Sequence, residues 1–489
     1  MQQLTGLDAN FLYLEAGATF GHVCGVALLD PTTRPDPLTL EVVQTVVAQR
    51  LHLLPPLRRR LVEVPFGIDR PYWAEDPDFD LDFHVREVAL PSPGTSHQLA
   101  EQVARIAARP LDRARPLWEL YLIEGLEQGR AALMVKFHHA AIDGVAGAEL
   151  LTTLLDQTPE PPDPAAPPVP FRAAPIPGEL QMWARGVLGL TLQPLKLLDY
   201  QWRLLRTLPR SARLVARTTG PALAETAARW SRGGPLADGG VLSWPGVGAP
   251  STSFNRAITP HRRWAYTSAS LDAVKAVKNA FGVTVNDVVM AACAAGLRQW
   301  LQVHHELPAQ PLLAMVPISI RTDQQRGSFG NRVAALVATL PTHLDDPVAR
   351  LRAAHEAMRV AKEQHAAIGA ETLQDVTQFA LPALATRAAR VAAQLRIADV
   401  VNPPYNVVIS NVPGPRTPLY FAGTRLLGYY PVSVVADGQG LNITVQSYLD
   451  NLDIGLISCR ELVPDLWDLL GYITNAFDEL AELARAEAR

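Results

Sequence analysis

The apolar residues of this chain follow two patterns. Some form short runs of strand length, and others recur every three or four positions over longer stretches, which is typical of helices. In the first half, Val23–Asp30, Trp118–Ile123 and Ala131–Phe137 have strand character, while Leu38–Leu54 and Ser96–Ala108 have helical period. This mixture predicts an α/β fold.

The second half repeats the same mixture without an internal sequence repeat. Predicted strands are Arg263–Ser268, Leu312–Ile320, Val333–Leu340, Tyr405–Ile409 and three segments near 426–435, 440–448 and 453–458. Predicted helices are Leu271–Ala280, Val283–Leu301, Pro347–Gln364, Glu371–Leu395 and a C-terminal helix containing Leu466 and Phe477. We therefore expect two similar α/β layers that face each other.

Two segments rich in proline or glycine separate the halves. Thr158–Pro177 contains so many prolines that neither a helix nor a strand ladder can form, and Gly233–Pro250 has the composition of a linker. With about 100 to 200 residues per domain as the usual size, we predict domains at 1–157 and 251–489, with a connector at 158–250.

Within the connector, Glu179–Arg232 has helical period, contains several tryptophans and carries mostly arginine charges. Basic amphipathic helices with aromatic residues lie on anionic membrane or lipid-droplet surfaces. A helical brace between the halves, with its arginines simply solvated, explains the same pattern. Both interpretations remain open.

Composition narrows the possible functions. The net charge of −4 gives no reason to expect nucleic acid, and three widely spaced cysteines provide neither a disulfide framework nor zinc-ligand spacing. The N-terminal residues lack signal-peptide character, and no run reaches the roughly 18 apolar residues that cross a bilayer. We expect a cytoplasmic protein whose membrane contact, if any, is peripheral.

The candidate chemistry follows the strand Ala131–Phe137. His138, His139, Asp143 and Gly144 fall in the connection to a helix that begins near Gly147, where a rigid scaffold can present side chains to substrate. The pair His304–His305 at a polar helix end and the single His84 are better explained as structural.

Two further segments allow more than one interpretation. Pro116, Leu117 and Trp118 could form the wall of a hydrophobic channel or simply pack in the core. Thr284 and Asp287 have the spacing of a capping box. Asn286 is not explained by that cap, and its amide lies beside free helix N–H groups that favour developing negative charge.

The spacing H-H-x-x-x-D-G resembles the CoA-dependent acyltransferase superfamily, which includes chloramphenicol acetyltransferase and peptide-synthetase condensation domains. Further motifs resemble the bacterial wax ester synthase/diacylglycerol acyltransferase family over essentially the whole chain. These motifs are Leu7-Asp8-Ala9, Pro116-Leu117-Trp118, Asn286-Asp287, Pro317–Arg321 with Gly330-Asn331, and Asn406–Pro415.

This resemblance implies two chloramphenicol-acetyltransferase-like domains, joined by a helical linker, with the active site in a tunnel between them. It implies acyl transfer from fatty acyl-CoA to diacylglycerol or a long-chain alcohol. No cofactor or metal is expected, because acyl-CoA is a substrate. The protein would associate peripherally with the inner face of the membrane or with lipid droplets.

An alcohol needs a base to remove its proton as it attacks, and histidine suits this task at neutral pH. We predict that His139 is this base and that Asn286, or more weakly Ser410, stabilises the oxyanion. His138 would pack and orient, with Gly144 in a supporting position. By resemblance, Asp143 forms a structural ion pair, with Arg321 as a candidate partner.

Pro116, Leu117, Trp118 and Arg321 are the candidate substrate-binding residues. No G-x-S-x-G elbow occurs, so we expect direct transfer in a ternary complex rather than a covalent acyl-enzyme. Two alternatives remain: a specialised acceptor such as a polyketide alcohol or a peptide-like thioester, and a non-catalytic lipid-droplet protein. The intact His139 and Asp143 favour an enzyme.

Overall fold

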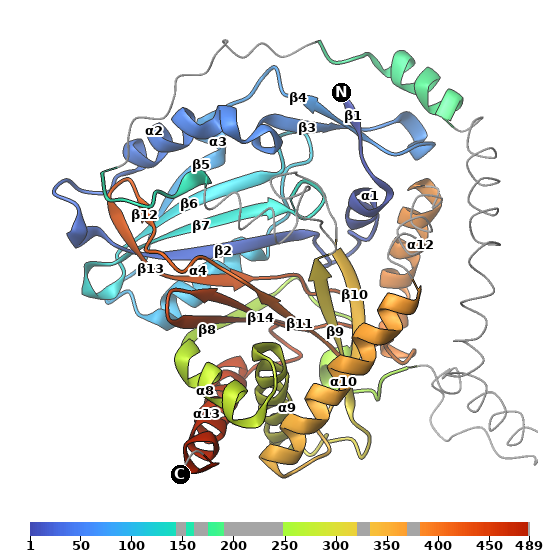
Figure 1. Cartoon of the computed structure of the whole chain (residues 1–489). Coiled ribbons are helices and arrows are strands. Elements are labelled where there is room, and N and C mark those ends of the chain that lie inside the picture. The colour runs from blue at the N-terminus through green and yellow to red at the C-terminus, as the bar shows by residue number, and fades with distance from the viewer. Residues whose placement is uncertain (143–152, 161–174, 190–247, 320–332, 369–381, 488–489) are drawn as a thin grey trace, which may run out of the picture.

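The computed structural model describes residues 1–142, 153–160, 175–189, 248–319, 333–368 and 382–487. Within these ranges the chain forms two six-stranded sheets and one three-stranded sheet, with helices packed on them (Figure 1). The prediction of an α/β fold is therefore confirmed.

The first large sheet carries the histidine pair at the end of its β7 strand, with strand order β12-β13-β2-β7-β6-β5. β2 and β6 flank β7 in antiparallel pairing, and β5 runs parallel to β6. Helices α2 and α4 belong to the same half. The bounds are β2 His22–Asp30, α2 Leu40–Arg50, β5 Val85–Ala89, α4 Ser96–Ala107, β6 Trp118–Glu124 and β7 Ala131–His138.

Two strands of this sheet come from the far end of the sequence. β12 (Tyr420–Phe421) and β13 (Thr424–Val432) join it through β2. A side chain at Gly25 would overlap the hydroxyl of Tyr429, so the glycine allows β13 to pack there. The predicted division of the chain at 158–250 did not anticipate that strands from the C-terminal half join the first sheet. The domain bounds themselves remain a prediction.

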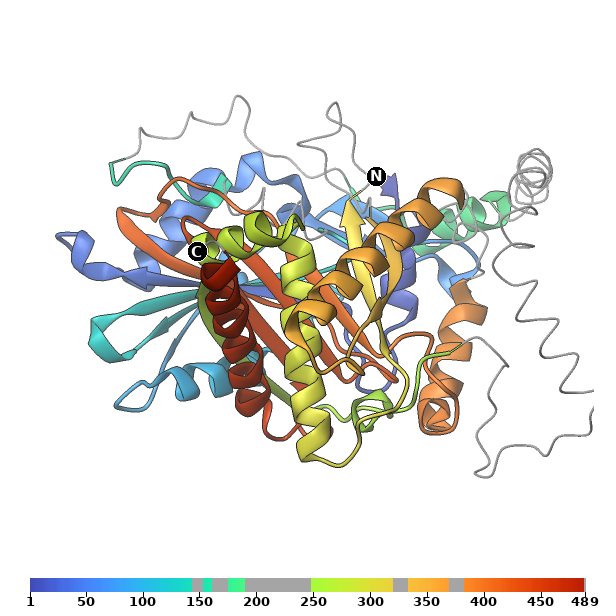
Figure 2. The same ribbon diagram turned by 60° about the horizontal axis from the view of Figure 1, so that its bottom comes forward.

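The second large sheet has the order β10-β9-β11-β14-β15-β8. Helices α8, α9, α10 and α13 cover one of its faces (Figure 2), and their apolar residues form one core with the sheet. The bounds are β8 Arg262–Ser270, α8 Leu271–Phe281, α9 Val285–Val303, β9 Leu312–Ser319, β10 Val333–Leu340, α10 Pro347–Ile368, β11 Val407–Val412, β14 Leu441–Tyr448, β15 Asn451–Cys459 and α13 Leu466–Glu487.

Smaller elements surround the histidine end of the first sheet. The three-stranded sheet has the order β1-β4-β3, and helices α1 and α12 lie beside each other (Figure 1). The bounds are β1 Gln2–Gln3, α1 Gly6–Tyr13, β3 Arg59–Val62, the 3₁₀ turn η4 Pro65–Gly67, β4 Tyr72–Glu75, α3 Leu81–His84, α12 Pro382–Gln394 and the 3₁₀ turn η8 Ile397–Asp399.

The two halves share an apolar core. α4 packs on β8, and β13 packs on β14 and β15. Leu99 and Val103 of α4 belong to the same buried cluster as Trp264 of β8 and Ile457 of β15. A cluster of buried apolar residues from both halves therefore holds them together.

Some predicted boundaries were wrong. The helix predicted over Leu38–Leu54 is α-helical only over Leu40–Arg50, and a 3₁₀ turn follows at Leu51–Leu53. The strand predicted at Tyr405–Ile409 continues to Val412, because its parallel pairing with β14 extends from Val408 to Val412. Ser410 therefore lies within a strand and not in a loop. Pairing of β11 with β9, by contrast, covers only Val407 and Val408.

Several predicted segments lie largely outside the described residues, including the helix start at Gly147 and most of Glu179–Arg232. The described part of the latter is helical over 179–189. No single helix of the described residues is long and apolar enough to cross a membrane. α8 and α9 together pass that test on length and composition, but only as a pair bent by 102°.

A buried carboxyl lies where β13 crosses the second sheet. Asp453 is fully buried, and it accepts hydrogen bonds from the Ser268 hydroxyl (2.6 Å) and the Tyr429 N–H (2.7 Å). Burial raises the pKa of Asp453 to about 6, although both hydrogen bonds act in the opposite direction.

The unfolding free energy of Asp453→Asn relative to wild type is therefore expected to increase by about 2–3 kcal/mol as the pH rises from about 4 to above 6. The raised folded-state pKa means that wild-type stability present at low pH is lost as the pH rises through about 6. Denaturant unfolding at several pH values measures this. The exposed Asp450→Asn is the control, and parallel pH profiles for the two variants would contradict the prediction.

Candidate active site

The two histidines occupy different positions because β7 ends between them. The His138 N–H still donates to the carbonyl of Leu117 (2.9 Å), which precedes β6, whereas the His139 N–H donates to the carbonyl of Gly21 (2.7 Å). The chain then turns, since the N–H of Ala141 donates to the carbonyl of His138 (2.9 Å). The backbone thus fixes the two rings in separate environments.

The His138 ring is buried, with 1% of the residue exposed. Its Nδ1 accepts a hydrogen bond from the Ala140 N–H (3.0 Å), so this hydrogen-bond pattern assigns the ring proton to Nε2. Nε2 then donates to Oε1 of Glu15 (3.0 Å). Because both ring nitrogens are engaged, this geometry agrees with the supporting role predicted for His138.

Glu15 is the anchor of this arrangement. Its Oε1 also accepts the N–H of Gly21 (2.7 Å), and its Oε2 accepts from the Arg113 guanidinium (2.6 Å). Burial alone would raise the pKa of Glu15, but the hydrogen bonds from His138, Gly21 and Arg113 lower it to about 2. Glu15 is therefore a fixed carboxylate anion beside His138.

His139 is half-buried, and its ring stacks on Phe11 of α1, with centroids 4.2 Å apart and planes 10° apart. Such stacking sets the plane of the imidazole ring. The segment from Phe11 to Gly21 therefore fixes the His139 backbone through Gly21 and the ring plane through Phe11.

Gly21 is needed for the close approach of His138. A Cβ at this position would lie 2.8 Å from the His138 Nε2 and 3.0 Å from the Phe11 carbonyl. The same residue donates to Glu15 and accepts from His139, so a shift here moves both histidines.

Gly21→Ala is therefore expected to cost about 1–3 kcal/mol of stability through overpacking and to lower kcat. Thermal unfolding and steady-state kinetics measure the two effects. The control is Gly471→Ala in α13, where a Cβ meets no atom within 4 Å. The unfolding free energy of Gly471→Ala should increase by about 0.5–1 kcal/mol, because alanine favours a helix interior over glycine. Equal behaviour of the two variants would contradict the role of Gly21.

Lys136, three residues before His139, is completely buried. Its Nζ donates to the carbonyls of Arg109 (2.6 Å) and Ile106 (3.2 Å) at the C-terminal end of α4, and it lies 3.5 Å from Glu119. Burial lowers the pKa of Lys136. A cation at a helix C-terminus interacts favourably with the helix dipole, so Lys136 ties β7 to the end of α4.

The predicted substrate-binding residues Pro116, Leu117 and Trp118 are all buried. The Trp118 Nε1–H donates to the carbonyl of Leu57 (2.7 Å), and its ring stacks on His84 with centroids 4.5 Å apart. This agrees with the packing interpretation of Trp118. His84 also hydrogen-bonds the Trp118 carbonyl through Nδ1 (2.7 Å), so the structural interpretation of His84 is confirmed.

Asn286 lies half-buried in the first turn of α9. The predicted capping box is confirmed, because Thr284 and Asp287 exchange side-chain and backbone hydrogen bonds. His355 of α10 adds a hydrogen bond to Asp287 (2.7 Å) that the sequence did not predict. The first helical turn is thus fixed, while the oxyanion role of Asn286 stays a prediction.

Of the remaining candidate site residues, the structure describes only one. Ser410 lies half-buried in β11, and its role stays a prediction. Asp143, Gly144 and Arg321 lie outside the described residues, so the proposed ion pair is untested.

Sequence reasoning missed Phe11, Glu15, Gly21, Arg113 and Lys136. One signal was present: a lysine within the apolar run Ala131–Phe137 needs buried partners. The contacts of the others join positions roughly a hundred residues apart, which no local pattern reveals.

The overall fold is that of the condensation domains of peptide synthetases. The first condensation domain of the calcium-dependent antibiotic synthetase matches with a TM-score of 0.55 at 18% identity, over 99% of this chain and 96% of that one. At this identity the match shows the fold alone: two chloramphenicol-acetyltransferase-like halves.

Comparison of the sequence with family models identifies the family more narrowly than the fold does. Residues 4–289 match the wax ester synthase/diacylglycerol acyltransferase catalytic domain, and residues 329–481 match the C-terminal domain of that family. This chain belongs to the wax ester synthase/diacylglycerol acyltransferase family. The family predicted from the motifs is confirmed, and the protein is an acyl-CoA-dependent acyltransferase.

The names of similar proteins agree with this family assignment. A Mycobacterium tuberculosis protein named as a diacylglycerol O-acyltransferase is 36% identical over 483 residues, covering 99% of this chain and 90% of its own length. The M. tuberculosis protein tgs2, also named as such, is 37% identical over 485 residues, covering 97% and 98%. The wax ester synthase/diacylglycerol acyltransferase of Marinobacter aquaeolei VT8 is 30% identical with a TM-score of 0.65, covering 99% and 100%.

Proposed function

We propose that this enzyme transfers a fatty acyl group from acyl-CoA to the hydroxyl of diacylglycerol or of a long-chain alcohol, with His139 as the general base. The observation that carries the proposal is the position of His139, which follows the last residue of β7, is half-buried, donates its backbone N–H to Gly21 and stacks its ring on Phe11. Buried His138, with its ring nitrogens in hydrogen bonds to Ala140 and Glu15, is assigned the supporting role. The names of the similar proteins support the choice of acceptor.

In the proposed step, the acceptor oxygen attacks the thioester carbonyl carbon while an imidazole nitrogen of His139 takes the hydroxyl proton. The C–O bond forms, and a tetrahedral oxyanion results. Collapse of this intermediate breaks the C–S bond and releases CoA as a thiolate, which takes the proton back from the imidazolium. The products are an ester and CoA thiol, without a covalent acyl-enzyme.

The remaining candidates have supporting roles in this step. The amide of Asn286, in a helical turn fixed by Thr284 and Asp287, would donate to the oxyanion. Asp143, in an ion pair with a cation such as Arg321, would hold the loop that follows His139. Neither a cofactor nor a metal takes part.

The acceptors proposed here dissolve in lipid and not in water. We therefore also propose that the enzyme works in the cytoplasm, peripherally attached to the inner face of the membrane or to lipid droplets. Large apolar side chains exposed on α12 and neighbouring segments support attachment to a lipid surface.

The test uses purified full-length protein with palmitoyl-CoA and, in separate reactions, diolein or hexadecanol in detergent, with release of free thiol followed over time. Release that depends on one or both acceptors, with the matching ester found by chromatography, would support the proposal. Absence of thiol release with both acceptors would reject it and favour a specialised acceptor or a non-catalytic role.

A further inference from the structure

Within the described part of the chain, the large exposed apolar side chains are concentrated on a few neighbouring segments. Of the fourteen large apolar side chains exposed among the residues that the structure describes, eleven lie on a connected group of segments. The group consists of Met1, the C-terminal end of α1, η4, residues 179–189 and residues 391–401. Scattered exposed apolar residues need no explanation, but a concentration of this kind marks an interaction site.

Direct contacts connect these segments. The sulfur of Met1 lies 3.9 Å from the guanidinium of Arg185 in helix 179–189. The same helix packs on the residues around η4, since a Cβ at Gly186 would contact Val64 and Ile68. α12 in turn contacts η4, α1 and η8. Figure 1 shows α1, α12 and the helix 179–189 together on the right-hand side of the molecule.

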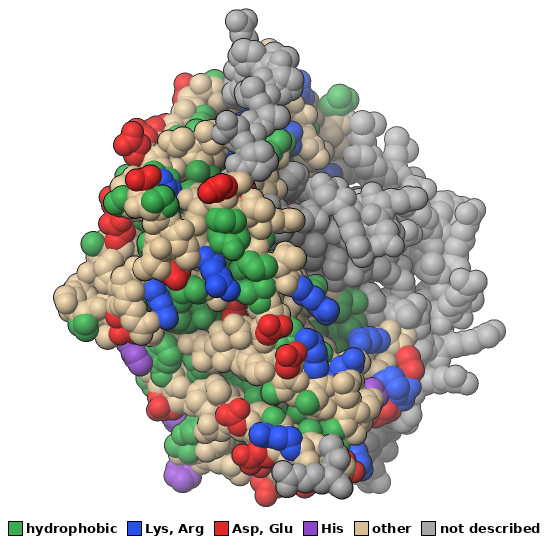
Figure 3. Space-filling model, turned by 60° about the vertical axis from the view of Figure 1, so that its left-hand side comes forward, with side chains coloured by type: hydrophobic (Ala, Val, Ile, Leu, Met, Phe, Trp, Pro, Cys, Tyr) green, Lys and Arg blue, Asp and Glu red, His purple; other side chains and the backbone are tan. Residues whose placement is uncertain are grey.

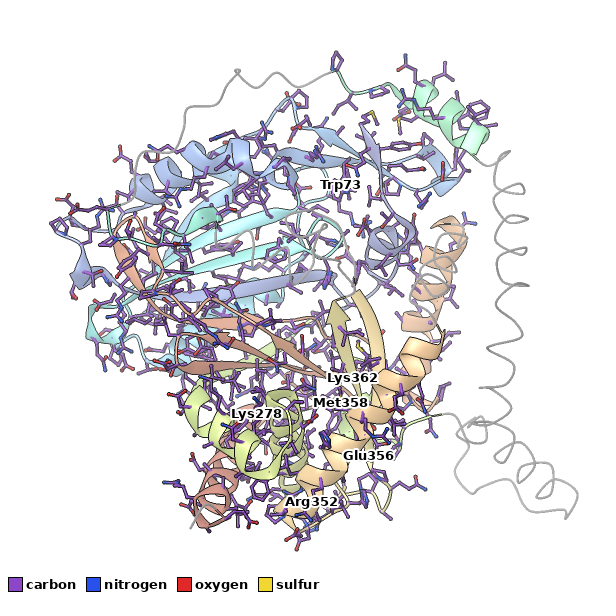
Figure 4. All side chains as sticks on the ribbon, viewed as in Figure 1. Trp73, Lys278, Arg352, Glu356, Met358 and Lys362 are labelled. Atoms are coloured by element: carbon purple, nitrogen blue, oxygen red, sulfur yellow. The ribbon has the colours of Figure 1, made fainter. Side chains whose placement is uncertain are left out.

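α12 is the centre of this surface. Ala393 faces inward, since it lies 3.5 Å from the position of a Cβ at Gly17. Its outward side carries Val391 (50% exposed) and Leu395 (68% exposed), one helical turn apart. α10 differs, because it buries Met358 and exposes charges of both signs, as an ordinary surface helix does (Figure 4).

The charges on this helix all have one sign. Arg387 and Arg390 are exposed beside Val391 and Leu395, and α12 contains no acidic residue. Arg396, just after the helix, forms an ion pair with Asp399 (2.6 Å) and therefore adds no net charge. A surface helix with apolar residues flanked only by basic ones is complementary to anionic lipid headgroups. The side shown in Figure 3 differs, because acidic and basic side chains alternate over it.

Two more apolar side chains extend the surface next to α12. Phe66 is 83% exposed at the tip of η4, in the left-handed region with φ of 61°, which is unfavourable for an aromatic residue. Leu14 is 61% exposed at the end of α1. We define the α12 face as Leu14, Phe66, Arg387, Arg390, Val391 and Leu395.

We propose that the α12 face docks on an anionic phospholipid surface, with its leucine, valine and phenylalanine side chains inserted between headgroups and its two arginines on the phosphates. α12 packs directly on the segment that holds Phe11, Glu15 and Gly21. Docking through this face therefore brings the histidine pair close to the lipid phase. The inference refines the proposed peripheral location, but binding can be measured without substrate.

The test is co-sedimentation of the full-length protein with phosphatidylcholine vesicles, with and without phosphatidylglycerol. We expect binding that requires phosphatidylglycerol and weakens with salt. The double variant Val391→Asp/Leu395→Asp should lower the affinity about tenfold or more. Arg387→Gln/Arg390→Gln should remove most of the salt dependence.

The matched control is Leu53→Asp/Val303→Asp, which changes two side chains of similar exposure elsewhere, and it should bind as wild type does. Unchanged binding by the α12 variant, or equal losses in both double variants, would overturn the proposal. So would a lowered melting temperature or a lower oligomeric state of the α12 variant without loss of vesicle binding, since the face would then be covered by this chain or by a second copy. Thiol release in detergent should survive in all variants, and its absence in wild type would instead reject the proposed function.

Discussion

Replacing His139 with alanine is expected to lower kcat/KM for acyl transfer by about 10²–10⁴-fold. His138 is not expected to replace His139, because His138 uses one ring nitrogen on Ala140 and the other on Glu15. The rate is measured as thiol release from palmitoyl-CoA at saturating acceptor. Circular dichroism and the melting temperature confirm that the variant is folded.

The other histidine pair provides a matched control. His305 is exposed just after α9, so His305→Ala should retain wild-type kinetics. Turnover that survives His139→Ala would exclude this residue as the base and leave the acyltransferase assignment to be explained by another group.

Glu15→Ala is expected to cost about 2–3 kcal/mol of stability and to lower kcat more than it raises KM. The change leaves the Nε2–H of His138 and the N–H of Gly21 without their buried acceptor, and each such loss costs about 1–3 kcal/mol. We classify Glu15 as a positioning residue, because it acts through His138 and Gly21 and not on the substrate.

Glu15→Gln is the conservative variant for comparison. Its amide oxygen can still accept from His138 and Gly21, while the ion pair with Arg113 is lost, so most of kcat should be rescued. If Gln and Ala variants lose kcat equally, the charge and not the hydrogen-bond geometry is what matters, and the positioning role as stated is wrong.

The pH dependence of stability provides a second readout for Glu15. Its folded-state pKa is lowered to about 2 from the ordinary 4.5. The carboxylate therefore contributes stability above pH 4.5, and this contribution is lost as the pH falls through about 2, amounting to about 3 kcal/mol. The unfolding free energy of Glu15→Gln should lack this acid-dependent loss, whereas identical acid profiles would contradict the assignment.

Much of the fold followed from local patterns. The strand predicted at Ala131–Phe137 is β7 to within one residue, and the helices at Ser96–Ala108 and Leu271–Ala280 each match to within one residue. These predictions succeeded because one face of each element is buried, which imposes a period of two or of about 3.6 on its apolar residues. Capping residues such as Thr284 then fixed helix starts.

Predictions failed where long-range pairing decided the outcome. β11 runs past Ile409 to Val412 because β14 continues to pair with it, and nothing in Ser410-Asn411-Val412 indicates that. β12 and β13 add to the first sheet because Gly25 leaves room for Tyr429, two residues separated by more than four hundred positions.

The sequence by itself determined the family, the alternation of strands and helices and the position of the histidine pair at the end of a strand. These are properties of neighbouring residues, or of motifs that can be read in order along the chain. Only the tertiary structure showed that Glu15, Gly21 and Phe11 hold the two histidines, and that the exposed apolar residues gather around α12. Hydrogen bonds and surface patches depend on distances in space, and packing brings those residues together from positions that no local pattern connects.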